Sequence, residues 1–154
     1  MNKFFTSTYP IINLYKKNSI KSEIITQMIY GESFSIIKKS KKWLKIKIKE
    51  DNYIGFIKNR NFSNYLKPTH KVCKLKANVY KISNNKIKKF ELPFGSKIKA
   101  IQSSSKFLKF NKGLIKKNEI KKINYKEKDL FKMITIFKNV KYKWGGESFK
   151  GIDC

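Results

Sequence analysis

The stretch Trp43-Leu-Lys-Ile-Lys-Ile-Lys49 alternates apolar and charged residues and fixes the fold class of the chain around it. A period of two is typical of a β-strand with one buried and one solvated face. The polar run Glu50-Asp51-Asn52 supplies a turn, and Tyr53-Ile-Gly-Phe-Ile57 returns as the partner strand of a hairpin. Upstream, Ser33 to Lys39 predicts a further strand. We therefore expect a sheet of short antiparallel strands.

The region around this hairpin recurs later in the chain as a weaker copy. Three pairs of segments align: Tyr30–Ile37 with Phe94–Ile101 and Lys42–Ile46 with Lys106–Phe110, both at the same offset, and Gly55–Lys58 with Gly113–Lys116 at a slightly smaller one. A repeat of this size indicates two similar small domains rather than one large one. We expect them over residues 9–66 and 70–123, joined near Pro68, with a short tail before Tyr9. Small all-β units of this kind are usually barrels or sandwiches.

From Asn124 the hydrophobic period changes to that of a helix. Asn124 with Glu127 three residues later resembles a capping box, which satisfies the free backbone amides at a helix start. The apolar residues beyond it follow helical spacing: Leu130, Phe131, Met133, Ile134, Ile136 and Phe137. We expect a helix over about Tyr125 to Lys138, part of whose apolar surface lies exposed or docks on the β-domains.

The formal charge of +27 over 154 residues comes almost wholly from lysine, with Arg60 the only arginine. A basic surface attracts nucleic acid, anionic membrane or anionic cell-wall polymer. Alternatively, lysine, asparagine and isoleucine are inflated together, as an AT-rich coding sequence would produce. Because phosphate and base recognition favours arginine forks over lysine point charges, we expect no nucleic-acid partner.

Few residues are suited to metal or redox chemistry. Cys73 and Cys154 are too isolated to imply a disulfide framework. With His70 as the single histidine and no CxxC motif, we expect no metal site, and no cofactor is indicated. The N-terminus lacks the apolar core of a signal peptide, and no run of 18 apolar residues occurs. We therefore expect a cytoplasmic protein without a membrane span; the sequence does not indicate its oligomeric state.

The C-terminal stretch Tyr142-Lys-Trp-Gly-Gly-Glu-Ser-Phe-Lys-Gly-Ile-Asp-Cys154 combines the residues of a tight turn with a terminal thiol. Its glycine pair permits a positive φ that other residues resist, and Trp144 offers a flat apolar wall. Asp153 is placed to orient a substrate amine or the backbone of Cys154. A cysteine becomes a nucleophile when its thiol is ionised, typically by a helix N-terminus and a nearby histidine.

This stretch resembles the segment that leads into the catalytic cysteine of NlpC/P60 cysteine peptidases. That pattern is roughly Tyr-x-Trp-Gly-Gly-x-Ser-x-x-Gly-x-Asp-Cys-Ser-Gly, and the chain matches it up to Cys154. The Ser-Gly, the helix that carries it and the histidine that follow in the family are missing from this sequence. The resemblance implies that residues 124–154 are the start of a papain-like α+β catalytic domain, opened by the predicted helix and incomplete here.

A second resemblance covers the first repeat. Ser22-Glu-Ile-Ile-Thr-Gln27, Tyr30-Gly-Glu32, Trp43 and Asp51-Asn-Tyr-Ile-Gly-Phe56 resemble the bacterial SH3-type domain of dipeptidyl-peptidase VI-like proteins. The pattern has Gly and Trp where this chain has an asparagine at 52 and a phenylalanine at 56. Asparagine tolerates a left-handed turn, and phenylalanine keeps an aromatic wall. The implied architecture is mainly β, with two tandem SH3-like β-barrels before the catalytic start.

Together the resemblances imply an endopeptidase that cleaves γ-D-glutamyl–diamino acid bonds in peptidoglycan stem peptides with a free N-terminal L-Ala, in muropeptide recycling. Cys154 is its expected nucleophile. The residues expected to bind substrate are Tyr142, Trp144 and Asp153 in the C-terminal stretch, and Glu32 and Tyr53 as a gate from the first SH3-like domain. The alternative for the gate pair is that Glu32 caps a turn and Tyr53 pairs across the hairpin.

The chain as written is expected to be inactive, because the family's histidine base follows its cysteine whereas His70 precedes it. Whether this molecule is an enzyme therefore stays open. The rival functions are a non-catalytic SH3-like module that binds cell-wall peptide and, third, a basic SH3-like nucleic-acid binder. Salt separates them, since phosphate binding weakens steeply with salt.

Overall fold

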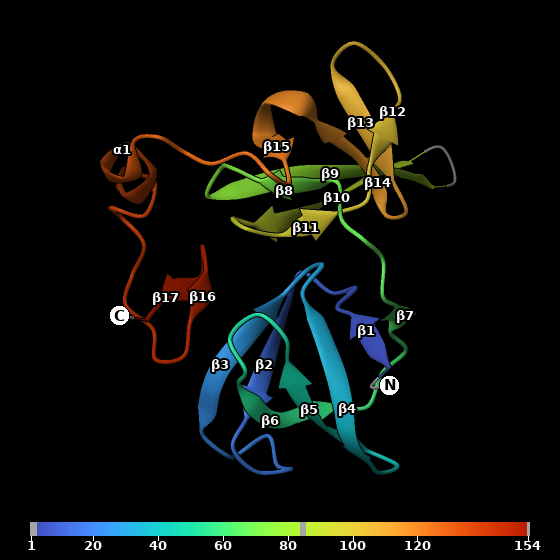
Figure 1. The fold of residues 1–154 in the computed structure, drawn as a ribbon, viewed down its shortest axis with the longest axis vertical. Coiled ribbons are helices and arrows are strands. Elements are labelled where there is room, and N and C mark those ends of the chain that lie inside the picture. Colours follow the sequence, from blue (N-terminus) through green and yellow to red (C-terminus); the bar gives the residue numbers. More distant parts are fainter. Residues whose placement is uncertain (1–2, 84–85, 154) are drawn as a thin grey trace.

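The computed structural model describes residues 3–83 and 86–153, which form two β-units and a C-terminal segment beside them (Figure 1). The first unit is a seven-stranded sheet in the order β3-β2-β6-β5-β4-β1-β7. Its strands are β1 (Phe4–Thr6), β2 (Ile11–Tyr15), β3 (Ile24–Ile29), β4 (Ser33–Lys39), β5 (Trp43–Ile48), β6 (Ile54–Lys58) and β7 (Ser63–Asn64).

The second unit contains a five-stranded sheet, β10-β9-β14-β13-β12, and a three-stranded sheet, β11-β8-β15. Its strands are β8 (His70–Val72), β9 (Lys76–Ser83), β10 (Lys86–Pro93), β11 (Lys97–Ile98), β12 (Ile101–Gln102), β13 (Phe107–Phe110), β14 (Gly113–Lys116) and β15 (Ile120–Lys122). A short 3-10 helix, η1 (Lys117–Glu119), precedes β15.

The predicted hairpin is confirmed. Strands β5 and β6 pair in antiparallel register from Trp43↔Lys58 to Lys47↔Ile54. The apolar residues Leu44, Ile46 and Ile48 are buried, while Lys47 and Lys49 are exposed. Asn52 adopts φ 66° in the turn, which is the left-handed conformation that asparagine tolerates.

The strand order repeats between the units. If β11 and β12 are taken as two halves of one strand, the order β3-β2-β6-β5-β4-β1-β7 matches β10-β9-β14-β13-β12/β11-β8-β15. Edge-to-face aromatic pairs also recur: Tyr15 with Trp43, at 5.8 Å between ring centroids, and Tyr80 with Phe107, at 6.1 Å. Trp43 and Phe107 are equivalent positions of the internal alignment, and Tyr15 and Tyr80 lie in the matching strands β2 and β9.

Each unit has its own hydrophobic core. The first is built around Leu14, Phe34 and Ile46, and the second around Val79, Leu92 and Ile115. Tyr30 is the exception to this separation, because it belongs to the first unit by sequence and packs in the second core. Its ring meets Phe110 edge-on at 5.9 Å.

The chain is mainly β, as expected, but its sheets do not close into barrels. The edge strands β3 and β7 of the first sheet are not paired with each other. A register shift between Ile36 and Lys38 bends β4, as β-bulges do. The prediction that these sheets close into barrels is therefore wrong.

The tail expected before Tyr9 is also wrong. Phe4–Thr6 forms β1, which pairs with β4 and β7. Phe5 stacks on the buried Phe34 at 5.8 Å, so burial of an aromatic ring orders this segment.

The helix α1 (Leu130–Thr135) is shorter than the expected span from Tyr125 to Lys138. Glu127 accepts hydrogen bonds from the Tyr125 hydroxyl (3.2 Å) and the Lys128 amide (3.1 Å), instead of closing a capping box with Asn124. The first helical bond therefore runs to the Asp129 carbonyl, from the Met133 amide. After Thr135 the chain continues as turns with bonds between residues three apart.

The apolar residues of the segment expected to be helical differ in exposure: Phe137 docks, whereas three residues of α1 are exposed. Phe137, just beyond the helix, packs edge-on against Phe94 of the second unit at 5.3 Å. Leu130, Phe131 and Ile134 are exposed, with Phe131 at 84%. In the described part of the chain, no helix has the length and hydropathy needed to cross a membrane.

Candidate functional site

The residues 141–153, which we call the C-terminal turn, form a compact loop held by its own backbone. Strands β16 (Glu147–Ser148) and β17 (Gly151–Ile152) pair in antiparallel register. The Lys143 amide bonds to the Ile152 carbonyl (2.9 Å) and the Asp153 amide to the Gly146 carbonyl (2.8 Å). The Asp153 carboxylate accepts a 2.6 Å bond from the Gly145 amide. Asp153 therefore fixes the turn that leads into position 154.

The C-terminal turn docks on β3 of the first unit, which lies far earlier in the sequence. The Thr26 hydroxyl donates a hydrogen bond to the Glu147 carboxylate. The side-chain oxygen of Gln27 accepts bonds from the Glu147 amide (3.1 Å) and the Ser148 hydroxyl (3.3 Å), while its nitrogen donates to Asn13 (2.9 Å). Thr26, Gln27 and Ser148 are buried. These bonds are thus shielded contacts, whose loss leaves unsatisfied polar groups.

Gly145 lets the turn approach the β3 backbone. It has φ +63°, so one member of the glycine pair adopts the positive φ that the pair is expected to permit. A Cβ added here would lie 3.0 Å from the Ile24 carbonyl oxygen and 3.2 Å from the Thr26 nitrogen. Beside it, the Trp144 side chain lies near Glu23, although 60% of the Trp144 surface remains exposed. Both stretches that carry the family resemblances therefore meet, since Glu23, Thr26 and Gln27 belong to one and the turn to the other.

Four carboxylates lie close enough to influence one another at this junction: Glu32, Glu50, Asp51 and Glu147, which we call the acidic group. Burial raises the pKa of Glu32 to about 8, and the neighbouring Glu147 and Glu50 contribute to this rise against the effects of the Ile29 amide and Lys97. Burial also raises the pKa of Glu147, as does Asp51, while the bond from Thr26 lowers it. In a chain of charge +27, the acidic group is a local concentration of acidic side chains.

The acidic group sits where the two units join. Lys97 of the second unit forms an ion pair with Glu50 at 2.7 Å, and the Glu50 carboxylate also accepts bonds from the Ser33 amide at 3.2 Å. The Tyr30 hydroxyl donates to Asn111 at 2.8 Å, and the Lys97 amide bonds to the Tyr30 carbonyl at 2.9 Å. The segment from Tyr30 to Ser33 is therefore fixed by both units.

Of the substrate-binding residues expected from the sequence, Glu32 belongs to the acidic group and Tyr53 follows Asp51 of that group, whereas Tyr142, Trp144 and Asp153 lie in the C-terminal turn. The Glu32 carboxylate accepts a hydrogen bond from the Ile29 amide (2.8 Å), which is the turn-capping contact of the alternative interpretation. Tyr53 is half exposed near the hairpin tip, where its amide bonds to Asp51 (2.9 Å), and Ile48 bonds back to its carbonyl (2.9 Å). Tyr142 is 62% exposed. The expected nucleophile Cys154 lies outside the described residues.

Neither His70 nor Cys73 belongs to this site. His70 lies in β8 of the second unit, and its Nδ1 is 2.9 Å from the Thr69 hydroxyl. Burial, and then the charge of Lys122, lowers the pKa of His70. Burial raises the pKa of the Cys73 thiol, which disfavours the nucleophilic thiolate. Across residues 3–83 and 86–153, no three His, Cys, Asp or Glu side chains are grouped to hold a metal ion.

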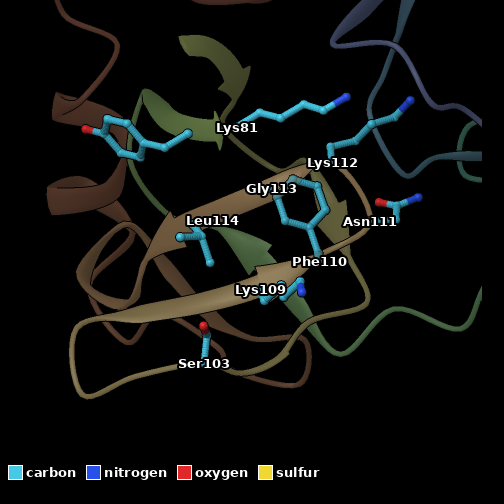
Figure 2. Close-up of a pocket in the computed structure, with 9 residues that line it drawn as sticks. Lys81, Ser103, Lys109, Phe110, Asn111, Lys112, Gly113 and Leu114 are labelled. Carbon is cyan, nitrogen blue, oxygen red and sulfur yellow. The ribbon is translucent and has the colours of Figure 1, made fainter. Parts of the chain in front are cut away.

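The hollow drawn in Figure 2 lies in the second unit, away from the C-terminal turn. It has a volume of about 430 Å³ and is lined by lysines, including Lys81, Lys109 and Lys112, beside Phe110 and Ser103. In Figure 2 the Lys81 and Lys112 ammonium groups lie above Phe110, with Ser103 apart from them below. Its lining contains no carboxylate, thiol or histidine, so it offers no acid–base pair.

Sequence reasoning missed several residues of the site: Thr26, Gln27, Glu50 and Glu147. Thr26 and Gln27 are part of the recurring SH3-type pattern, which marks them without giving a contact. Glu147 occupies a variable position of the Trp-Gly-Gly-x-Ser pattern, and Glu50 is expected only in a turn. Their roles depend on pairings across 17 to 121 residues, which local patterns do not encode.

Comparison with known proteins agrees with this architecture. Residues 14–61 match the family model described as the bacterial dipeptidyl-peptidase SH3 domain. The crystal structure of an NlpC/P60 family protein from Bacillus cereus superimposes with a TM-score of 0.81 at 16% identity, over 99% of this chain and 69% of that one. No curated protein matches the sequence.

Two further structures, NlpC1 and NlpC2 from Trichomonas vaginalis, match at 13% and 12% identity. The match to NlpC1 covers 84% of this chain and 48% of NlpC1, and the match to NlpC2 covers 94% of this chain and 59% of NlpC2. Each has a TM-score of 0.35. The family-model match and the Bacillus cereus structure show that the chain contains a segment similar to a bacterial dipeptidyl-peptidase SH3 domain and shares the fold of an NlpC/P60 family protein.

Proposed function

We propose that the chain is the front part of an NlpC/P60-type cysteine endopeptidase that cleaves γ-D-glutamyl–diamino acid bonds in peptidoglycan stem peptides with a free N-terminal amine. The observation that carries the proposal is the docking of the C-terminal turn on Thr26 and Gln27. It brings the segment leading to Cys154 against the first β-unit, beside the acidic group. We further propose that residues 9–66 and 70–123 are both SH3-like domains and that residues 124–154 open the catalytic domain.

The acidic group supplies the chemistry for recognising the amine. An ammonium ion is stabilised by ionised carboxylates in a partly buried site, where Coulomb attraction is weakly screened. Glu32 has a pKa of about 8 and is mostly protonated at neutral pH without a ligand. An ammonium beside it favours its ionised form, so binding releases a proton. The proposed acids are Glu32 of the acidic group and, outside that group, Asp153 of the C-terminal turn, whose carboxylate also accepts the Gly145 amide bond. Tyr53 and Tyr142 are the proposed phenolic walls.

In the proposed reaction, the Cys154 thiolate attacks the carbonyl carbon of the γ-glutamyl amide, and the C–N bond breaks as the diamino acid amine leaves with a proton. Water then hydrolyses the thioester and restores the thiol. His70 is held in β8, so we do not propose it as the base that ionises Cys154. In the family that the chain resembles, the base is a histidine that follows the cysteine. Release of a peptide that begins with free L-Ala fits the recycling of cleaved wall fragments in the cytoplasm.

The first test is binding of the tripeptide L-Ala-γ-D-Glu-diaminopimelate to the 154-residue chain, with the N-acetylated tripeptide as the matched control. Calorimetry should give at least about tenfold weaker binding for the acetylated peptide, which lacks the ammonium. Glu32→Gln should remove most of that difference. Equal affinities for the two peptides would contradict the proposal.

The second test concerns catalysis. If the reading frame continues past the Cys154 codon with Ser-Gly and a later histidine, the complete protein should release L-Ala-γ-D-Glu from the tripeptide. Cys154→Ala should abolish release while leaving tripeptide binding in place. Amine-dependent binding by a protein whose frame stops at Cys154 would instead favour the non-catalytic peptide-binding module.

A further inference from the structure

A second hollow, separate from the acidic group, lies on the outer face of the first unit where the C-terminal turn meets it. It has a volume of about 330 Å³, within the range of roughly 300–1,000 Å³ typical of small-molecule sites. Four of the side chains that line it are cations: Lys58, Arg60, Lys143 and Lys150. We call it the cationic hollow.

The four cations come from two distant segments. Lys58 ends β6 and Arg60 follows it, whereas Lys143 and Lys150 lie in the C-terminal turn, at the other end of the sequence. The docking bonds of Gln27, which also lines the hollow, bring the segments together. Lysine enrichment alone would scatter charges along a strand. It does not account for cations from two distant segments gathering at one hollow.

The charges of the hollow are not neutralised by the protein around it. Its lining contains no carboxylate, and the three ion pairs found among the described residues lie elsewhere, at Lys16–Glu23, Lys76–Glu91 and Lys97–Glu50. Like charges gathered in a concave site raise the local potential and attract anions. The gathered cations are therefore available to a ligand.

Two of the cations are held in place by aromatic rings. The Arg60 guanidinium lies 4.8 Å from the centroid of Tyr9, and the Lys58 ammonium lies 5.9 Å from that of Trp43. Cation–π contacts of this length restrict a side chain without neutralising its charge. Arg60 is also the single arginine of the chain, and its planar fork suits bidentate binding of an oxyanion.

We propose that the cationic hollow binds a compact dianion, a phosphate monoester or a dicarboxylate, which bridges β6 and the C-terminal turn. A ligand held by both segments binds more tightly when the turn is docked, so by linkage it stabilises the docked turn. The inference rests on the docking geometry and does not depend on the proposed peptidase function.

The test is calorimetric titration of the 154-residue chain with inorganic phosphate and with succinate, at constant ionic strength and with acetate as the monoanion control. Two variants remove opposite walls of the hollow: Lys58→Gln/Arg60→Gln and Lys143→Gln/Lys150→Gln. The matched control, Lys109→Gln/Lys112→Gln, removes the same charge from the hollow of the second unit (Figure 2). Each wall variant should weaken dianion binding by at least about tenfold and the control by less than about twofold.

Amide exchange supplies a second readout. Phosphate or succinate should slow exchange of the Glu147 amide, which bonds to Gln27, in the wild-type chain and in the control but not in the wall variants. The ranking of phosphate against succinate identifies which dianion the hollow prefers.

Equal weakening in all three variants, or acetate binding as tightly as the dianions, would show non-specific attraction and overturn the proposal. Much tighter binding of a single-stranded oligonucleotide, lost equally in every variant, would also overturn it. If the cationic hollow does not bind dianions, the protein should still bind the free-amine tripeptide more tightly than the acetylated one. The two proposals can therefore fail separately.

Discussion

Strands β3 and β10 occupy the same place at the edge of their sheets, yet their side chains are used differently. Asn13 pairs with Gln27 across β2 and β3, and Asn78 pairs with Glu91 across β9 and β10, so Gln27 and Glu91 hold equivalent positions. Gln27 holds the C-terminal turn, whereas Glu91 forms an ion pair with Lys76 at 2.7 Å. The edge strand β3 is bonded to the C-terminal turn, whereas Glu91 of β10 bonds to Lys76 of its own sheet; the Lys76 ammonium in turn lies 5.6 Å from the Phe149 ring centroid of the turn.

The neighbouring position shows the same contrast. Thr26 bonds to Glu147, but the equivalent residue in β10 is Phe90, which packs against its own core. A common strand order therefore does not give the two units a common role. The role depends on which polar groups an edge strand leaves available, since exposed strand edges invite further partners.

The largest expected effect comes from the equivalent glycines Gly31 and Gly95. Both have positive φ, at +85° and +80°. A Cβ on Gly31 would lie 1.9 Å from the Lys97 carbonyl oxygen, whereas one on Gly95 would meet Ile29 at 3.5 Å. We expect Gly31→Ala to lower the free energy of unfolding by about 4 kcal/mol or more, because left-handed strain adds to a clash with the second unit.

Gly95→Ala is the matched control. It should lower the free energy of unfolding by about 1–2 kcal/mol, because only the left-handed backbone strain applies there. Urea unfolding followed by tryptophan fluorescence measures both. Similar losses for the two variants would mean that Gly31 is not fixed against the second unit.

The second prediction concerns Glu32, whose equivalent in the second unit is the buried Ser96. Because the pKa of Glu32 is raised to about 8, the folded state holds a proton that the unfolded state loses near pH 4.5. Its contribution to stability is therefore complete below about pH 4.5 and is lost as pH rises to about 8. As pH rises from about 4.5 to about 8, the free energy of unfolding of Glu32→Gln should increase by about 2–4 kcal/mol relative to that of the wild type.

Urea unfolding of both proteins across this range tests the sign, and the difference between them cancels the effect of the overall charge. Ser96→Ala, at the position that does not titrate, should differ from wild type by the same amount at both ends of the range. A Glu32→Gln difference that does not change with pH would contradict a raised pKa.

The smallest effect is expected from the docking bonds themselves. Gln27→Leu removes the bonds to Asn13, Glu147 and Ser148 and should weaken docking of the turn by about 1–3 kcal/mol. Hydrogen exchange should then speed up at the Glu147 amide. Glu91→Leu, at the equivalent position of β10, should leave that amide unchanged. The contrast between the edge strands would be contradicted if the Glu147 amide exchanged more slowly in Gln27→Leu than in the wild type. Equal acceleration of that exchange in Gln27→Leu and Glu91→Leu would also contradict it.

Local patterns predict much of the β-structure. The alternation over 43–49 indicates the strand, its buried face and its hairpin partner, and the strand predicted over Ser33–Lys39 has the bounds of β4. These features depend on residues two apart, whose side chains point to the same face of one strand. The repeat likewise anticipates equivalent strands and aromatic pairs.

Patterns fail where a competing contact, distant or local, decides the outcome. Phe4–Thr6 is expected to be a tail, and it is a strand because β4 and β7 lie on either side of it. The helix is expected to begin at Tyr125, but Glu127 bonds within its own turn and leaves Asp129 to begin the helix. In both cases the sequence carries a local signal that a competing contact overrides.

By itself the sequence determined the mainly β class, the repeat, the hairpin and the two stretches that resemble known families. The tertiary structure decided that these two stretches touch, that Tyr30 enters the second core, and that a few carboxylates in a basic chain gather at one junction. The physical reason is distance along the chain. Periodicity describes how a residue faces its own strand, whereas these contacts join groups up to 121 residues apart.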